Sequence, residues 1–385
     1  MKLQATEQAS AANRLNPDNN PIVLVLQGGG ALGAYQAGVF EALHEHDLVP
    51  DWIVGTSIGA INAALIAGNP QESRLQKLKE FWRRVSHGDG FDMSRLPDEA
   101  RKANVSAATL DTMMRGVPGF FSPRLFSPFA AGFSVEPDAA SFYETRDLRT
   151  TLKELVDFDY LNAEGGMRLT VNALKVTCGE LASFDNREHD LCADHVMASG
   201  ALPPGFPPVR IDGELYWDGG LYSNTPLETV LNDQPHANAL CFMVDLWSAQ
   251  GEEPRTLDEV QTRQKDVMFA SRSMRHIDAY LETHKLQRAL RDLYKRLPAK
   301  QKNAADKQLL SELGCDSTLH IVRIPYAGQD WHMAAKDINF SRGSIEWRWE
   351  QGYRDGMRAV KQAGWLANVS EDTAVVIHEI APDPV

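Results

Sequence analysis

The sequence lacks the features that mark several large classes of protein. Among its 385 residues, 39 Lys and Arg stand against 52 Asp and Glu, and the formal net charge is -13. This acidic balance argues against nucleic-acid binding and against a general attraction to anionic lipid. The longest apolar runs, such as 22–26, are far shorter than the roughly 20 residues that span a bilayer. Any membrane contact would therefore be peripheral and local.

Cysteine pairs and targeting signals are also missing. The four cysteines lie far apart without C-x-x-C spacing, so they indicate neither a zinc site nor a disulfide framework; they are Cys178, Cys192, Cys241 and Cys315. We expect reduced, mostly buried thiols in a cytoplasmic protein, with no metal and no cofactor. Residues 1–20 lack the basic flank and apolar stretch of a secretory signal, and we expect a disordered leader there.

What the sequence does contain is the alternation of strand and helix patterns typical of a parallel α/β fold. The continuous β-branched run 22–26 ends in glycines and predicts a strand buried on both faces. Residues 34–46 predict a helix, and 51–54 a second short strand. An Ala-rich helix at 58–68 and another helix at 71–85 follow.

Later segments continue this pattern within one domain, which we place at residues 21–250. The expected further strands of the same sheet are 168–174, 181–184, 214–217 and 239–244, with a short helix at 194–199.

One region within that domain looks like an insertion. Residues 87–145 interleave Gly, Pro and Ser with phenylalanines and predict a loop-like, apolar segment. A lid over a binding site and plain packing on the core are equal alternatives. The phenylalanines are Phe120, Phe121, Phe126, Phe129 and Phe133.

Residues 251–385 predict a mostly helical C-terminal region with one late strand at 319–324 and a last helix at 344–363. Within it, 263–307 carries 12 Lys and Arg against 5 Asp and Glu, a local excess of +7. Such a balance is typical of a solvated helix face, and a helix that docks on a membrane or a partner is the alternative.

The first candidate site element is a glycine-rich loop after the first strand. Residues 27–33 read QGGGALG, which satisfies the G-x-G-x-x-G spacing of a dinucleotide site. Such a site also needs an acid at the end of the second strand, and that strand ends in V-G-T-S instead. The same backbone donors can form an oxyanion hole, which we place at Gly28, Gly29, Gly30 and Gly33, with the N–H groups of Gly29 and Gly30 as donors.

The second element is the segment Gly55-Thr56-Ser57-Ile58-Gly59, between the second strand and the Ala-rich helix. In a nucleophile elbow the serine occupies a strained strand-to-helix turn, so glycines must flank it. A tight turn with a capping serine is the alternative. The strand before and the helix after favour Ser57 as a nucleophile.

A serine nucleophile needs a base. Chain order in an α/β-hydrolase triad would make His332 that base, although nothing in the surrounding sequence marks it. The other candidate is Asp218, which ends an apolar strand and precedes Gly219 and Gly220. By turn chemistry alone, Asp-Gly-Gly would be an ordinary turn.

Taken together, these elements resemble the patatin-like phospholipase family. The family's glycine-rich oxyanion segment is matched by 28–33, and its G-x-S-x-G elbow by 55–59. Its A-S-x-A-x-P segment is matched by 198–203 and its D-G-[AG] element by 218–220. The four matches follow the family's order within 22–244.

The resemblance implies a three-layer α/β fold with a mainly parallel sheet flanked by helices, and a dyad of Ser57 and Asp218 in place of a triad. It also implies hydrolysis of acyl esters, typically of lipids. Family members often carry Arg or Lys where this chain has Leu32, so the oxyanion hole must rest on backbone N–H groups.

We therefore predict a carboxylic ester hydrolase of phospholipase A type that works through an acyl-enzyme on a lipid or another acyl ester. A nucleotide-binding oxidoreductase that uses Gly28–Gly33 and a non-catalytic acyl-binding protein are the alternatives. Acyl chain length, head group, oligomeric state and peripheral membrane contact stay open.

Overall fold

The computed structural model describes residues 15–87, 98–124, 134–233, 238–270, 273–313, 318–328, 335–367 and 373–381. In these residues nine strands form one sheet in the order β11-β10-β9-β1-β2-β5-β8-β7, with β6 paired to β5. The strands are β1 (Ile22–Leu26), β2 (Trp52–Gly55), β5 (Arg168–Lys175), β6 (Leu181–Asp185), β7 (Val209–Ile211), β8 (Glu214–Asp218), β9 (Ala239–Asp245), β10 (Leu319–Pro325) and β11 (Val375–Glu379). A separate antiparallel pair joins β3 (Ser122–Pro123) to β4 (Tyr143–Glu144).

Most neighbours in the large sheet run parallel, as the sequence predicted. The strands from β11 to β5 pair in parallel, whereas β5 pairs antiparallel with both β6 and β8, and β7 with β8. The parallel strands β1 and β2 end at the same edge of the sheet, and β8 approaches that edge from the antiparallel part. This arrangement brings the three predicted site elements to one edge.

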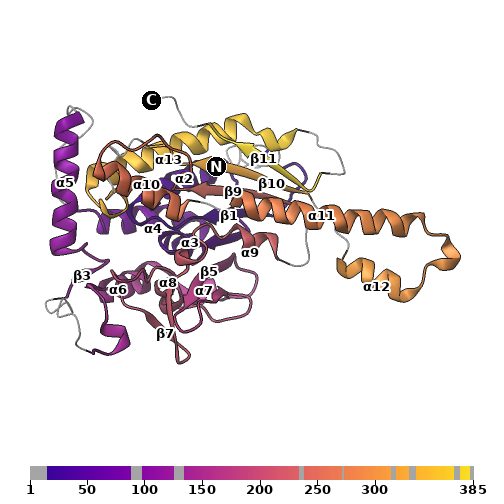
Figure 1. Cartoon of the computed structure of the whole chain (residues 1–385), viewed down its shortest axis with the longest axis horizontal. Coiled ribbons are helices and arrows are strands. Elements are labelled where there is room, and N and C mark those ends of the chain that lie inside the picture. Colours follow the sequence, from indigo (N-terminus) through magenta and orange to yellow (C-terminus); the bar gives the residue numbers. More distant parts are fainter. Residues whose placement is uncertain are drawn as a thin grey trace.

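Helices cover both faces of the sheet, so the fold has three layers (Figure 1). Successive residues of a strand point to opposite faces. Accordingly, Leu24 packs with α2 (Gly33–Glu45), α3 (Ile58–Ala67), α4 (Gln71–Arg84) and α13 (Arg342–Gln362), whereas Val23 and Val25 pack with α9 (Leu227–Leu231) and α11 (Ser273–Arg296). The remaining α-helices are α5 (Asp98–Arg115), α6 (Arg146–Leu155), α7 (Phe158–Leu161), α8 (Ala193–Ser199), α10 (Leu257–Phe269) and α12 (Ala304–Leu313).

The C-terminal region is built into this fold. Strands β10 and β11 extend the parallel sheet beside β9, and α13 packs along α2. The sequence predicted one late strand in residues 251–385, and the structure has two. Strand β11 was not predicted, although its sequence VVIHE begins with three β-branched residues; it is a short strand at the edge of the sheet and is only partly buried. Figure 1 shows α11 extending past the sheet, with α12 at its outer end.

The predicted loop-like character of residues 87–145 is wrong for α5, which is an 18-residue helix. The Gly, Pro and Ser residues around it gave the whole stretch a loop-like composition. The phenylalanines at 126, 129 and 133 lie outside the described residues, so their predicted roles stay predictions.

Two smaller expectations also change. Of the three described cysteines, Cys178 and Cys192 are exposed and only Cys241 is buried, because the first two lie in a turn and at a helix start. Within the predicted leader, Leu15 packs against the core and its carbonyl accepts a hydrogen bond from Trp365.

Among the described helices, none is long and apolar enough to cross a membrane.

Helices α2 and α13 approach so closely that glycines are needed at the crossing. A Cβ on Gly352 would lie 2.0 Å from the carbonyl oxygen of Tyr35, and one on Gly38 would lie 2.0 Å from that of Trp349. Backbone cannot give way as a flexible side chain can, so the crossing fixes how α13 seats on the fold.

We predict that Gly352→Ala lowers the free energy of unfolding by about 1–3 kcal/mol, because overpacking outweighs the better helix propensity of alanine. Urea denaturation measures this change. Arg354→Ala is the control, since this arginine lies on the exposed face of the same helix, and it should shift the value by less than about 0.5 kcal/mol. Equal losses in the two variants would contradict the close approach.

Candidate active site

Ser57 occupies a strained turn between β2 and α3. Its φ of 58° and ψ of -123° lie in a region that side-chain-bearing residues rarely adopt. Glycines flank it because space is absent: a Cβ on Gly59 would lie 2.2 Å from the Leu26 carbonyl oxygen, and one on Gly55 2.5 Å from the Gly59 carbonyl oxygen. The turn has the backbone geometry of a nucleophile elbow.

The Ser57 hydroxyl and the Asp218 carboxyl group line the same cavity, and the hydroxyl lies close enough to the carboxyl group to lower its pKa. Asp218 ends β8 and is only 3% exposed, and its Oδ1 accepts a 2.7 Å hydrogen bond from the Gly220 N–H. Burial raises the pKa of Asp218 to about 7, although the Ser57 hydroxyl and the Gly220 N–H both act to lower it. The structure thus places a carboxyl group that titrates near neutrality beside the hydroxyl.

The glycine loop lies against the same site. Gly28, Gly29 and Gly30 line one cavity together with Ser57 and Asp218. The predicted loop residue Gly33 is not among the lining residues. A Cβ there would lie 2.5 Å from the Ile58 side chain, so Gly33 serves the packing of α2 on α3.

The two glycines of the D-G-G element also differ in whether they line the cavity. Gly220 lines the cavity and donates to Asp218, whereas Gly219 packs against the backbone of β5, where a Cβ would lie 2.4 Å from the Asn172 carbonyl oxygen. The four sequence matches therefore meet at one place, with some of their glycines facing the cavity and others permitting close packing behind it.

The cavity has a volume of about 480 Å³ and a largely apolar wall. Phe120 and Phe121 from the predicted insertion are buried and form part of this wall. Their rings lie 6.0 Å and 5.1 Å from the ring of Phe206, and Phe120 also contacts Phe340 at 5.6 Å. These two phenylalanines are therefore fixed elements of the site.

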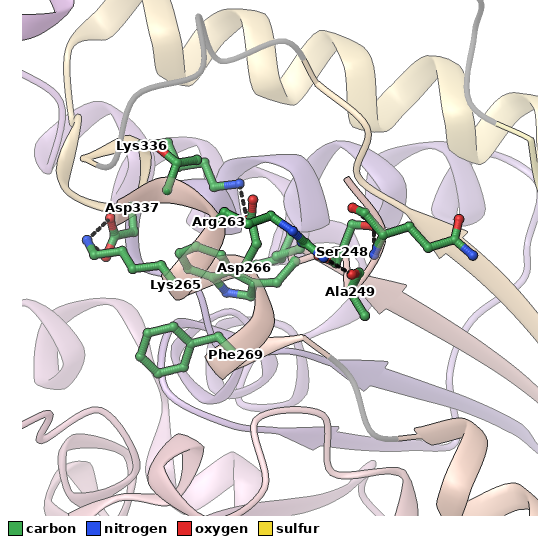
Figure 2. Close-up of polar contacts among 12 residues, drawn as sticks. Ser248, Ala249, Arg263, Lys265, Asp266, Phe269, Lys336 and Asp337 are labelled. Atoms are coloured by element: carbon green, nitrogen blue, oxygen red, sulfur yellow. Dashed lines mark hydrogen bonds and ion pairs between the residues drawn. The ribbon is translucent and has the colours of Figure 1, made fainter. Parts of the chain in front are cut away.

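The C-terminal region closes part of the cavity. Lys265 and Phe269 of α10 and Asp337 of the 3-10 helix η6 (Lys336–Ile338) are lining residues. Lys265 forms a 2.8 Å ion pair with Asp337, and Lys336 forms a 2.6 Å pair with Asp266. These pairs fasten α10 to η6, as Figure 2 shows.

Several polar residues at the site were missed from sequence. Ser199 accepts a 3.0 Å hydrogen bond from the Ser57 N–H, although the sequence marked it only as part of a motif. Gln27, Asn224 and Trp247 hold the glycine loop, and their only sequence signal was proximity to glycines or to the end of a strand. His332 lies outside the described residues.

No group of three or more His, Cys, Asp or Glu side chains in the described ranges is placed to hold a metal ion. The polar groups of the cavity include the Ser57 hydroxyl, the Asp218 carboxyl group and the backbone of the glycine loop, set in a largely apolar wall.

A family model described as patatin-like phospholipase matches residues 24–231, and one described as patatin phospholipase matches residues 267–372. The chain belongs to the patatin-like phospholipase family. The first match contains the elbow, the glycine loop and Asp218, and the second covers α11, α12 and α13.

Among curated relatives, the chain is 44% identical over 210 residues to patatin-like phospholipase domain-containing protein 7 of Mus musculus, covering 54% of this chain and 12% of the relative. It is 37% identical over 79 residues to triacylglycerol lipase ptl3 of Schizosaccharomyces pombe, covering 20% of this chain and 16% of the relative. The chain thus matches only a small part of each relative's length.

Among solved structures, VipD from Legionella pneumophila aligns over 93% of this chain and 72% of its own, with 15% identity and a TM-score of 0.38.

The buried carboxyl group of Asp218 makes stability depend on pH. Because its folded pKa of about 7 exceeds the ordinary value of 3.8, the stabilisation from proton binding is complete below about 3.8 and is lost as the pH rises through about 7. We predict that Asp218→Asn, which cannot ionise, melts a few degrees higher than the wild type at pH 8.

Differential scanning calorimetry at pH 5 and pH 8 measures the melting temperatures of Asp218→Asn and the wild type. The difference between the two melting temperatures should be smaller at pH 5 than at pH 8. Asp159→Asn, a replacement at an exposed carboxyl group, controls for the removal of one negative charge from an acidic chain. A lower melting temperature of Asp218→Asn at pH 8 would contradict the destabilising burial.

Proposed function

We propose that the protein is a serine acyl hydrolase in which Ser57 is the nucleophile and Asp218 its base. The observation that carries this proposal is the position of the Ser57 hydroxyl beside a nearly fully buried carboxyl group in one cavity. The glycine loop and an apolar cavity adjoin the same pair. Membership of the patatin-like phospholipase family supports lipid acyl esters as the substrate class.

The reaction follows from these groups. Asp218, ionised, accepts the proton of the Ser57 hydroxyl as its oxygen attacks the acyl carbonyl carbon. Backbone N–H groups of the glycine loop stabilise the negative charge on the carbonyl oxygen. The ester C–O bond then breaks, and the leaving alcohol takes the proton from Asp218.

An acyl-enzyme at Ser57 remains. Water gives a proton to Asp218 and attacks the acyl carbon, and the C–O bond to Ser57 breaks as the serine oxygen recovers that proton. The products are a fatty acid and the free enzyme. Desolvation suits Asp218 to this cycle, because a carboxylate with a pKa near neutrality is a stronger base than an ordinary one.

The cavity suits an acyl chain better than a nucleotide. Its volume of about 480 Å³ lies within the range of small-ligand pockets, and phenylalanine and other apolar side chains dominate its wall. The intact Ser57 and Asp218 pair argues against the non-catalytic alternative. We propose a phospholipase A type of cleavage for the same reasons.

Exposed apolar side chains beside the cavity suit peripheral contact with a lipid surface, which we include in the proposal. Met113 and Phe142 line the cavity and remain 48% and 36% exposed. Leu221 and Tyr222 follow the lining residue Gly220 and are also exposed. Contact there would transfer an acyl chain from a bilayer to the cavity through a largely apolar path. A cytoplasmic location stays a prediction.

We predict that Ser57→Ala and Asp218→Asn each lower kcat for a chromogenic acyl ester by on the order of 10³-fold or more, because each removes a partner of one proton transfer. A serine-directed fluorophosphonate probe should label Ser57, as mass spectrometry of the peptide would show. Ser183→Ala, an exposed serine on β6, should retain wild-type turnover.

His332→Ala distinguishes dyad from triad. A large loss of kcat in this variant, together with a mild effect of Asp218→Asn, would contradict the dyad and favour the histidine.

The pH dependence of the reaction is a separate prediction. The base must be ionised, so kcat/KM should fall as the pH drops through about 7, with a tenfold loss per pH unit below it. Steady-state rates from pH 5 to pH 9 measure the midpoint. A rate that stays level down to pH 5 would show that the buried carboxyl group of Asp218 is not the base.

A further inference from the structure

The Gly28–Gly29 peptide is held from one side by two side-chain donors. The carbonyl oxygen of Gly28 accepts a 2.8 Å hydrogen bond from the indole Nε1 of Trp247 and a 3.1 Å hydrogen bond from Nδ2 of Asn224. A carbonyl oxygen has two lone pairs, and these donors occupy both. Trp247 is 4% exposed, so its bond is shielded from water.

This arrangement fixes the direction of the next N–H group. In a planar trans peptide, the N–H of Gly29 points opposite to the C=O of Gly28. Gly29 is buried, lines the cavity, and its N–H makes no hydrogen bond to an acceptor elsewhere in the described chain. A buried donor without a partner is costly unless a ligand supplies the acceptor.

We propose that Trp247 and Asn224 are positioning residues that hold the Gly28–Gly29 peptide with its N–H toward the substrate's carbonyl oxygen. This inference rests on the proposed function. Two adjacent glycines allow a peptide to rotate at little steric cost. Rotation would turn the Gly28 carbonyl toward the cavity, where it would repel the oxyanion instead of stabilising it.

A residue of the C-terminal region hydrogen-bonds the side chains that hold the glycine loop. The carbonyl oxygen of Phe269, at the end of α10, accepts hydrogen bonds from Asn224 Nδ2 at 3.0 Å and from Gln27 Nε2 at 3.1 Å. The Oε1 of Gln27 in turn accepts from the backbone N–H of Trp247 at 3.0 Å. Trp247 lies between the two matched segments and Phe269 at the start of the second, so residues beyond the first matched segment complete a site that it begins.

The chain offers a closely matched control for the indole hydrogen bond. Trp365 is 8% exposed, donates its Nε1 to the Leu15 carbonyl oxygen at 2.7 Å, and contacts the ring of Phe242. Trp247 likewise contacts the ring of Phe269. Replacement of either tryptophan by phenylalanine removes one indole-to-carbonyl hydrogen bond, and of the two only Trp247 adjoins the glycine loop.

The experiment compares Trp247→Phe and Trp365→Phe in the full chain with a chromogenic acyl ester. Trp247→Phe should lower kcat about 10-fold with KM unchanged, since the bond orients a donor used in the transition state. With Asn224→Ala added, the loss should approach about 10²-fold, the effect of losing an oxyanion donor. Trp365→Phe should keep wild-type kcat, and the melting temperatures of the two single variants should fall alike.

The pH midpoint separates loop positioning from damage to the dyad. In Trp247→Phe the midpoint of kcat/KM should stay at the wild-type value while the plateau falls. A wild-type kcat in Trp247→Phe, an equal loss in Trp365→Phe, or a shifted midpoint would overturn the inference while leaving the proposed function standing. A wild-type chain that neither hydrolyses the ester nor labels at Ser57 would overturn both.

Discussion

Withdrawal of the Asp218 carboxyl group from water is the constraint on which the site depends. Burial disfavours its charge, and the nearby Ser57 hydroxyl and a hydrogen bond from the Gly220 N–H only partly compensate. The carboxyl group therefore keeps a high proton affinity next to a hydroxyl. The same burial destabilises the folded protein when Asp218 is ionised. A property that suits catalysis therefore lowers stability, and the large surrounding core offsets that loss.

Keeping that group dry requires segments far apart in the chain to meet with almost no space between their backbones. Gly59 touches the end of β1, Gly219 touches β5, and Gly30 adjoins Asp337, each at a distance that a Cβ would not allow. The C-terminal region is thus part of the site. It extends the sheet through β10 and β11, and it supplies Lys265, Phe269 and Phe340 to the cavity.

Much of the fold could be predicted because its signals are local. A continuous apolar run marks β1, small residues mark α3, and a glycine-flanked serine between strand and helix marks the elbow. The prediction failed at α5, where the surrounding composition masked a helix, and at β11, a half-exposed edge strand. Gly33 was assigned to the oxyanion loop because spacing cannot distinguish a glycine that faces a cavity from one that permits packing.

The sequence by itself determined the first strands and helices from β1 to α4, the turn at Ser57 and the candidate acid at Asp218, because each depends on residues close together in the chain. Only the tertiary structure decided that burial would raise the pKa of Asp218 and that Asn224 and Trp247 would bind the glycine loop. Burial and hydrogen bonding across some 200 residues depend on how the sheet orders its strands. That order places β8 and the end of β9 at the glycine loop, and it cannot be predicted from a local sequence pattern.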